Sequence, residues 1–428
     1  MIKALNSFVR SHLKGDYAKN TVTLLAGSSA AHLISALMLP ILSRLYSPEQ
    51  FGAFGVFLSI IGITAIFSTG KFELAIISEP KLVRRVALVL LAIITSIAVM
   101  SFLVLLYASL VALNFFEYKG ITLGVLVLLC IGLLGTVVHD SLINFKISQE
   151  TVLPIARAKI VRVTAASLVQ GLCYLIGAVK IGLPAGEVVG RIAAASSVCR
   201  FKHTKVTKLR IGRMVTYLKL VAIRNSEYPI KIAPSWTLNN ASTLLLPAFL
   251  SWQYGLAVSG GFFLMYKVFS LPETAIVQSV NQSFMVEFKR YIGSPKKQLA
   301  IFRKTARILF SLSLVIYPLL GFVFYYGVGV FFGDEWERYS LFGVLIIPYF
   351  IAQFTMSSLY VSLNILSEHS YQLVWDIFRS GTLCLLCVIV SCRDIHILYF
   401  ISFLSVFTFV SYGLLFWLIR SVILKSCD

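Results

Sequence analysis

The sequence predicts an all-α polytopic membrane protein with about 12 transmembrane helices in two six-helix lobes. Composition is the first observation: 58% of the 428 residues are hydrophobic and only 13% are charged, with a mean hydropathy of +0.86. Soluble domains are usually about half apolar and about a quarter charged. A soluble interior of this size cannot bury so much apolar surface, so lipid must solvate much of the chain.

Apolar runs of membrane-spanning length are the second observation, because a transmembrane helix needs about 20 such residues. The run 182–199 is short and carries both Glu187 and Arg191. The candidate spans are 22–43, 52–77, 86–113, 121–144, 153–179, 182–199, 233–252, 256–282, 306–332, 340–364, 370–391 and 395–419.

The distribution of basic residues is the third observation, and it sets the predicted orientation. With the N-terminus inside, 29 of the 38 Lys and Arg residues fall on the inner side or at the inner ends of spans, five lie in outer loops, and the other four lie inside spans. Cytoplasmic segments of membrane proteins carry such an excess. We therefore expect both termini to be cytoplasmic. The same rule explains the net charge of +20 without a nucleic-acid partner.

A basic stretch divides the predicted spans into two halves. It contains five Lys and Arg residues between Lys205 and Lys219, interleaved with Val and Leu. This pattern fits an interfacial helix on an anionic leaflet, and it fits a solvated linker equally well. The predicted segments are a cytoplasmic lead-in at 1–20, a first lobe at 21–199, the linker at 200–232 and a second lobe at 233–428.

A weak internal repeat relates the two halves. Phe51-Gly52 and Tyr254-Gly255 each join an outer loop to a Gly-containing apolar helix, six spans apart. Parallel repeats of this kind occur in transporters, although aromatic-Gly pairs are also common at membrane interfaces. Lys71 follows Gly52 by 19 residues and Lys267 follows Gly255 by 12, a difference of nearly two helical turns. The repeat thus predicts both lysines on one face of equivalent helices.

Charged residues inside spans are costly, so each is a candidate functional residue. Glu187 with Arg191, and Asp376 with Arg379, have the spacing of pairs that neutralise each other on one helix. A structural role is expected for both pairs, and their arginines are also candidate substrate-binding residues.

Lys71 and Lys267 lack such a partner on their own helices, and Glu73 is expected to point away from Lys71. Two ammonium groups in a shared cavity would suit an anionic headgroup. The alternative for Lys71 is that its side chain extends to the cytoplasmic interface.

Other polar residues in the spans have two interpretations each. Asp140, Glu73 and Glu273 are candidate ion-coupling residues, with His32 and His139 as possible assistants, while interhelical hydrogen bonding is the alternative. The amides that could bind sugar hydroxyls, or hold helices together, are Asn239, Asn240, Asn281 and Gln282.

The sequence does not predict an enzyme. It lacks the G-x-S-x-G, P-loop and H-E-x-x-H motifs, and it predicts no metal site and no cofactor. Cys384 and Cys387 have a C-x-x-C spacing, but Leu-rich sequence surrounds them, which indicates packing rather than redox or zinc chemistry.

Five segments of the chain form an ordered set of motifs over about 21–380. One is Lys71-Phe-Glu73-Leu-Ala-Ile-Ile, and the others begin at Leu39-Pro-Ile-Leu-Ser-Arg, at Ala222-Ile-Arg-Asn-Ser-Glu, at Tyr266-Lys-Val-Phe-Ser-Leu-Pro and at Gly333-Asp-Glu-Trp. In this order the segments resemble those of polysaccharide transporters of the MOP flippase superfamily. The Lys71 segment is similar to the family's Arg-Tyr-Glu-x-Ala-Ile segment, with Lys in place of Arg.

The resemblance implies a Wzx-like flippase of the bacterial inner membrane. Such a protein moves an undecaprenyl-pyrophosphate-linked O-antigen or capsule unit to the periplasmic leaflet by alternating access, in lipopolysaccharide or polysaccharide biosynthesis. Its partners would be the lipid-linked oligosaccharide, membrane lipids and, as candidates, the polysaccharide polymerase and chain-length machinery. The substitution at Lys71 and the polar pair His139-Asp140 depart from the family pattern. The alternatives are an ion-coupled small-molecule or drug exporter of the same superfamily and a membrane O-antigen polymerase.

Overall fold

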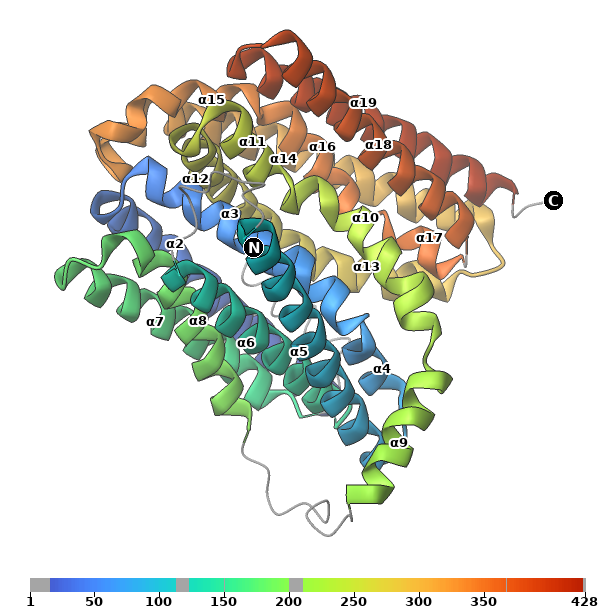
Figure 1. Cartoon of the computed structure of the whole chain (residues 1–428). Helices are drawn as coiled ribbons and strands as arrows, with labels where there is room; N and C mark the ends of the chain where they lie inside the picture. The colour runs from blue at the N-terminus through green and yellow to red at the C-terminus, as the bar shows by residue number, and fades with distance from the viewer. Residues whose placement is uncertain (1–15, 113–122, 150, 200–210, 367, 426–428) are drawn as a thin grey trace. The chain divides into compact units, whose positions relative to one another are not determined.

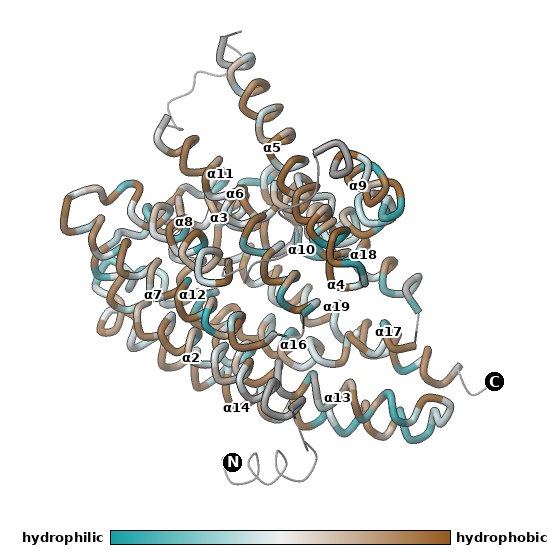
Figure 2. The backbone as a smooth tube through the Cα atoms, turned by 90° about the horizontal axis from the view of Figure 1, so that it is seen from below, coloured by the Kyte–Doolittle hydropathy of each residue, from teal (hydrophilic) through white to brown (hydrophobic). Residues whose placement is uncertain are grey.

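The protein is helical throughout the part of the chain that the structure describes. The computed structural model describes residues 16–112, 123–149, 151–199, 211–366 and 368–425, and no strand occurs in these ranges (Figure 1). Most of the predicted lead-in and the first part of the predicted linker lie outside them. In Figure 2 the long helices are mostly apolar, while α9 (Ile211–Arg224) carries a polar stretch.

Helices coincide with every predicted span. The first six correspond to α2 (Asp16–Leu45), α3 (Pro48–Thr69) with α4 (Phe72–Ser78), α5 (Leu82–Ala112), α6 (Leu123–Ile147), α7 (Leu153–Leu175) and α8 (Val179–Val198). The next three correspond to α10 (Ala233–Leu244) with α11 (Leu246–Tyr254), α12 (Leu256–Pro272) with α13 (Gln278–Arg290), and α14 (Pro295–Phe332). The last three correspond to α15 (Ser340–Leu345) with α16 (Ile347–Ser357) and α17 (Val361–Ile365), α18 (His369–Arg393), and α19 (Ile397–Lys425).

The all-α polytopic membrane class is confirmed. Among the described residues, seven helices are long and apolar enough to cross a membrane alone, and an eighth span is added if the bent pair 334–345 and 347–365 counts as one. The other predicted spans fall on helices that are broken or carry more charge. α7 holds Arg157, Lys159 and Arg162, and α8 holds Glu187 and Arg191.

Several spans that we predicted as continuous helices are broken, and proline accounts for most of the breaks. Proline has no N–H and clashes with the preceding turn. Within the predicted span 256–282, a π-helical segment, Glu273–Val277, follows Pro272. Another π-helical segment, Tyr228–Ile232, contains Pro229 and lies directly before the predicted span 233–252. Pro247 and Pro348 lie in the first turns of α11 and α16.

The break between α3 and α4 has a different cause. Gly70 and Lys71 both have left-handed backbone conformations, with φ of 53° and 60°. An added Cβ at Gly70 would lie 2.9 Å from Pro229, so this turn needs glycine for space as well as for conformation. Lys71 is thus in a helix break rather than inside a continuous span, which corrects the prediction of a helix over 52–77.

The chain divides into two compact units. The first comprises residues 1–38 and 60–237, and the second comprises 39–59 and 238–428. The first has a buried apolar cluster that includes Phe72, Ile76, Leu88 and Phe145. The second has its own cluster, to which α13, α14, α18 and α19 contribute. The lobe boundaries expected from the sequence remain a prediction.

The amphipathic α9 packs within the first unit. Its Val221 is fully buried in the apolar cluster, with Tyr217 and Leu218 against it, and the helix contacts α5. The described part of the predicted linker is therefore a packed helix and not merely a solvated connection.

Candidate substrate and coupling sites

A close helix hairpin builds the main charged cluster of the first unit. α7 and α8 are joined by a short turn at Gly177, which has φ of 76° (Figure 1). A Cβ at Gly190 would lie 2.6 Å from the carbonyl oxygen of Arg162, and one at Gly186 would lie 2.4 Å from Gln170. Glycine therefore allows the two backbones to approach, which brings side chains of α7 and α8 into contact.

Glu187 lies between two arginines in this hairpin. Its Oε1 accepts hydrogen bonds from Nε of Arg191 at 2.8 Å and from Nη2 of Arg162. Arg191 also donates to Oγ1 of Thr136 on α6. The predicted Glu187–Arg191 pair is confirmed, but it is part of a triad with one carboxylate and two guanidinium groups, so the triad has a formal charge of +1.

Other polar side chains of the first unit lie on α6, α7 and α2. Asp140 on α6 lies 2.8 Å from His139, and its side chain is 52% exposed. It is accessible, as an ion-coupling residue must be. Lys159, which the sequence analysis did not single out, donates to Ser28 at 2.6 Å and so connects α7 to the first half of α2. His32 lies on the same α2 and is half-buried.

The side-chain contacts of Lys71 also differ from those that we predicted. Its Nζ lies 3.2 Å from Oε1 of Glu73 and 4.4 Å from the ring centroid of Trp236. The left-handed conformation of Lys71 turns its side chain toward Glu73, although residues two apart on a regular helix do not face each other. The expectation that Glu73 points elsewhere was therefore wrong. Glu73 is buried, and its Oε2 has no hydrogen-bond partner among the described residues.

In the second unit, Asp376 and Arg379 organise a polar cluster around α18. Asp376 accepts hydrogen bonds from the hydroxyl of Tyr360 at 2.8 Å and from Nδ2 of Asn239 at 3.1 Å. Nη2 of Arg379 lies 3.8 Å from Asp376 and donates to the carbonyl oxygen of Asn239 at 2.6 Å. The predicted pair is confirmed, and Asn239 joins it.

The Arg379 guanidinium also stacks on an aromatic ring. It lies 4.7 Å from the ring centroid of Trp375, and its Nη1 donates to the hydroxyl of Tyr412 at 3.4 Å. Its Nε is buried with no hydrogen-bond partner among the described residues. The cluster therefore holds α18 against α10 and α19 while leaving one charged donor unsatisfied.

Glu273 forms a second acidic centre in this unit. It begins the π-helical segment after Pro272 and accepts hydrogen bonds from Gln353 at 2.7 Å and from Ser357 at 2.6 Å. Both donors lie on α16, so the carboxylate connects the broken α12 span to that helix. Within the described ranges no group of three His, Cys, Asp or Glu side chains could hold a metal ion.

Three other predicted residues of this unit are Lys267, Asn240 and Asn281. Lys267 is exposed on α12, with Nζ 5.2 Å from the ring centroid of Phe263. Asn240 is half-buried on α10, and Oδ1 of Asn281 is buried on α13 without a partner in the described part of the chain. The side chain of Gln282 lies outside the described residues.

The helical phase that placed Lys71 and Lys267 on equivalent faces depended on matching Gly52 with Gly255. The contacts match Gly52 with Gly260 instead. A Cβ added at Gly52 would lie 1.9 Å from the carbonyl oxygen of Leu256, and a Cβ added at Gly260 would lie 1.8 Å from the carbonyl oxygen of Pro48. Each glycine is four residues into its helix and meets the first residue of the other. With this register the two lysines differ by 12 positions rather than seven, and Lys71 lies beyond the end of α3 in a left-handed conformation. The helical phase therefore does not place both lysines on one face, and the predicted common face was wrong.

Comparison with known proteins identifies the fold. No protein-family model and no curated protein sequence matches the chain. An inward-facing multidrug resistance MATE family transporter of the MOP superfamily matches with a TM-score of 0.62 at 13% identity, over 94% of this chain and 95% of that one. The chain has the fold of a MOP-superfamily transporter.

Two other solved structures with this fold illustrate its range. An outward-facing MATE transporter matches with a TM-score of 0.54 at 14% identity, over 96% of this chain and 97% of that one. A MOP transporter from Pyrococcus furiosus, described as having a binding pocket of reverse polarity and a different function, matches with a TM-score of 0.50 at 14% identity, over 97% of this chain and 98% of that one. These neighbours are transporters rather than enzymes.

Proposed function

We propose that the protein is an alternating-access transporter for an amphipathic cargo. The observation that carries the proposal is the match over 94% of the chain to a transporter in an inward-facing conformation, together with the match to an outward-facing one. Moving between such conformations alternately opens a central site to either side of a membrane. The seven long apolar helices support a position in the membrane.

The comparisons favour export of a small amphipathic molecule, because most of the solved neighbours are MATE proteins and two of them are described as multidrug resistance transporters. Glu273 is the candidate coupling residue in this case. Its carboxylate accepts hydrogen bonds from two neutral side chains, Gln353 and Ser357. Neither donor carries a positive charge that would compete with a proton or a cation for the carboxylate.

The charged cluster of the first unit favours a different cargo, the lipid-linked oligosaccharide that the family resemblance implies. Arg162 and Arg191 share the single carboxylate of Glu187. A site with excess guanidinium groups attracts phosphate and repels a cationic drug, because guanidinium donors match phosphate oxygens in pairs. The Pyrococcus furiosus neighbour, described as having a pocket of reverse polarity, indicates that this fold accommodates both signs of charge.

Loss of the gene in its own host separates the two cargos. A flippase predicts loss of surface polysaccharide, with lipid-linked repeat units accumulating on the cytoplasmic leaflet. A drug exporter predicts normal surface polysaccharide and increased retention of cationic dyes. Single repeat units on the outer lipopolysaccharide core would show that translocation is intact, and a polymerase would then be the better assignment.

A further inference from the structure

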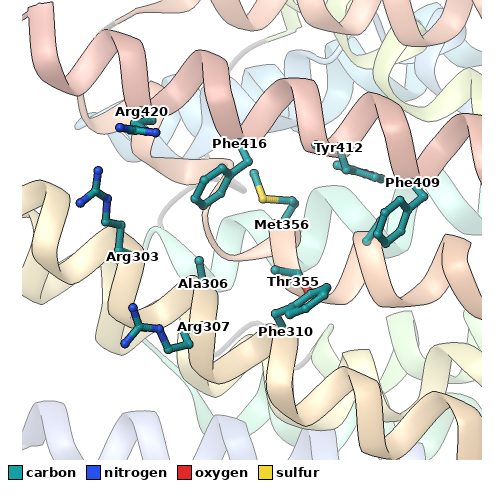
Figure 3. A pocket seen from close by; sticks show the side chains of 12 residues that line it. Arg303, Ala306, Arg307, Phe310, Thr355, Met356, Phe409, Tyr412, Phe416 and Arg420 are labelled. Carbon is teal, nitrogen blue, oxygen red and sulfur yellow. The ribbon is translucent and has the colours of Figure 1, made fainter.

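A cavity of about 460 Å³ lies within the second unit, between α14, α16 and α19. This volume is in the range of pockets that hold small ligands, about 300–1,000 Å³. Its lining includes three cationic side chains, Arg303, Arg307 and Arg420, and two aromatic ones, Phe310 and Phe409 (Figure 3). Gly413 also lines it.

The cavity is cationic at one end and apolar at the other. Figure 3 shows the three arginines together, with Phe310 and Phe409 displaced from them along the helices. Along α14, Phe310 is seven residues from Arg303 and three from Arg307, and along α19, Phe409 is eleven residues from Arg420. At 1.5 Å per residue, the two aromatic side chains are displaced from the arginines by about 4–16 Å along the helices.

Within the described ranges, none of Arg303, Arg307 and Arg420 forms an ion pair or a side-chain hydrogen bond. Nε of Arg420 is buried without an acceptor among the same residues. Arg303 and Arg307 are exposed, so their donors can reach an acceptor from outside the protein. Arg420 differs from an arginine that simply extends to the membrane surface, which would keep all its donors in water. A buried guanidinium donor needs an acceptor, which a bound anion would supply.

The apolar end of the cavity is exposed at the protein surface and contains open space. Phe310 and Phe409 are 40% and 42% exposed, so they meet the solvent of the spanning segments, which is lipid. A Cβ added at Gly413 would meet no atom within 4 Å, so glycine leaves open space there.

We propose that this cavity binds an anionic phospholipid of the surrounding bilayer, with its phosphate between the three arginines and an acyl chain along Phe310 and Phe409. A free anion would use only the arginines and leave the apolar end empty, whereas a lipid occupies both. The positive-inside prediction assigns this lipid to the cytoplasmic leaflet, which is the anionic one. The site is independent of the cargo and of the proposed transport.

Native mass spectrometry of the full-length protein in detergent tests the proposal, with phosphatidylglycerol compared with phosphatidylcholine of the same acyl chains. The triple variant Arg303→Gln, Arg307→Gln, Arg420→Gln should weaken phosphatidylglycerol binding at least about tenfold. A matched control removes three cations from the same helix end but outside the cavity, with Lys296→Gln, Lys297→Gln and Lys304→Gln, and should retain binding.

A steric variant gives a second, charge-neutral test. Gly413→Trp should fill the apolar end and weaken phosphatidylglycerol binding, whereas Gly381→Trp, at another helical glycine with open space around its Cβ, should not.

Equal binding of the two lipids, or full phosphatidylglycerol binding by both the triple arginine variant and Gly413→Trp, would overturn the proposal. Displacement of the lipid by inorganic pyrophosphate alone would indicate a free-anion site. Displacement by short-chain polyprenyl pyrophosphate at lower concentration would assign the cavity to cargo, and either result would also overturn it.

Discussion

Gly52 and Gly260 meet in a reciprocal contact in which each glycine lies against the first turn of the other's helix. Gly52 of α3 faces Leu256 and Gly260 of α12 faces Pro48, with no room for a Cβ on either. Two helices related by a local two-fold axis make such contacts, since each presents the same position to the other. Close backbone approach through small residues is the usual means of packing membrane helices.

Substitution of these glycines should therefore lower stability. We expect Gly52→Ala and Gly260→Ala each to cost about 1–3 kcal/mol, because the added Cβ meets a backbone oxygen that cannot move alone. Thermal unfolding in detergent measures the loss. Gly171→Ala on α7, where a Cβ meets nothing within 4 Å, is the control and should be neutral or slightly stabilising. Equal effects at all three positions would contradict the contact.

The Glu187 triad gives a second prediction. Glu187→Gln leaves Arg162 and Arg191 without their shared carboxylate and should cost about 2–3 kcal/mol, less than the loss of a partner in a fully buried pair because these side chains are only partly buried. The exposed pair of Glu227 and Lys231 is a matched comparison, and Glu227→Gln should cost at most about 1 kcal/mol. The free energies of unfolding of the two variants measure the difference, and a similar loss in both would show that the triad is solvated.

Lys267 tests whether an exposed cation on α12 contacts the cargo. If it binds an anionic headgroup, Lys267→Ala should reduce transport about tenfold or more at unchanged protein level, while Lys267→Arg should retain part of the activity because the charge remains. Lys304→Ala on α14 serves as the control. Normal transport by well-expressed Lys267→Ala protein would remove this residue from the mechanism.

Orientation can be measured at two exposed positions, Ser294 before α14 and Glu335 in the 3-10 helix after it. Single cysteines replace Ser294 and Glu335 in a variant without native cysteines, and intact spheroplasts are labelled with a membrane-impermeant maleimide. The charge distribution predicts labelling at position 335 from outside and at position 294 only after permeabilisation. The opposite pattern would invert the topology and assign the phospholipid site to the other leaflet.

The helices could be predicted from the sequence, but their breaks and partners could not be predicted in full. Apolar runs of fixed length indicate spans because the bilayer sets that length. The left-handed turn at Lys71 has no signature in an apolar pattern, since lysine rarely adopts it. The role of Arg162 was missed because its partner is 25 residues away on another helix. Proline positions were the available signal for the breaks at Pro229, Pro247 and Pro272.

The register of the internal repeat could not be predicted from the sequence either. Both aromatic-Gly pairs lie near helix starts, so matching Gly52 with Gly255 is reasonable from sequence. Backbone contact selects Gly260 instead, five residues further on. Five residues are about 1.4 helical turns, so this shift in register moves a side chain to a different face. The inference about Lys71 and Lys267 failed for that reason, although helices are present in both predicted halves of the repeat.

Transport by the purified protein tests the proposed function most directly. The protein is reconstituted into proteoliposomes, and translocation of a fluorescent lipid-linked oligosaccharide is measured alongside efflux of a cationic dye, with and without an ion gradient. We predict that one of the two cargos crosses the bilayer at a rate well above that of protein-free vesicles, with the guanidinium excess around Glu187 favouring the anionic one. Failure of correctly folded protein to move either cargo, under any gradient, would contradict the proposed function.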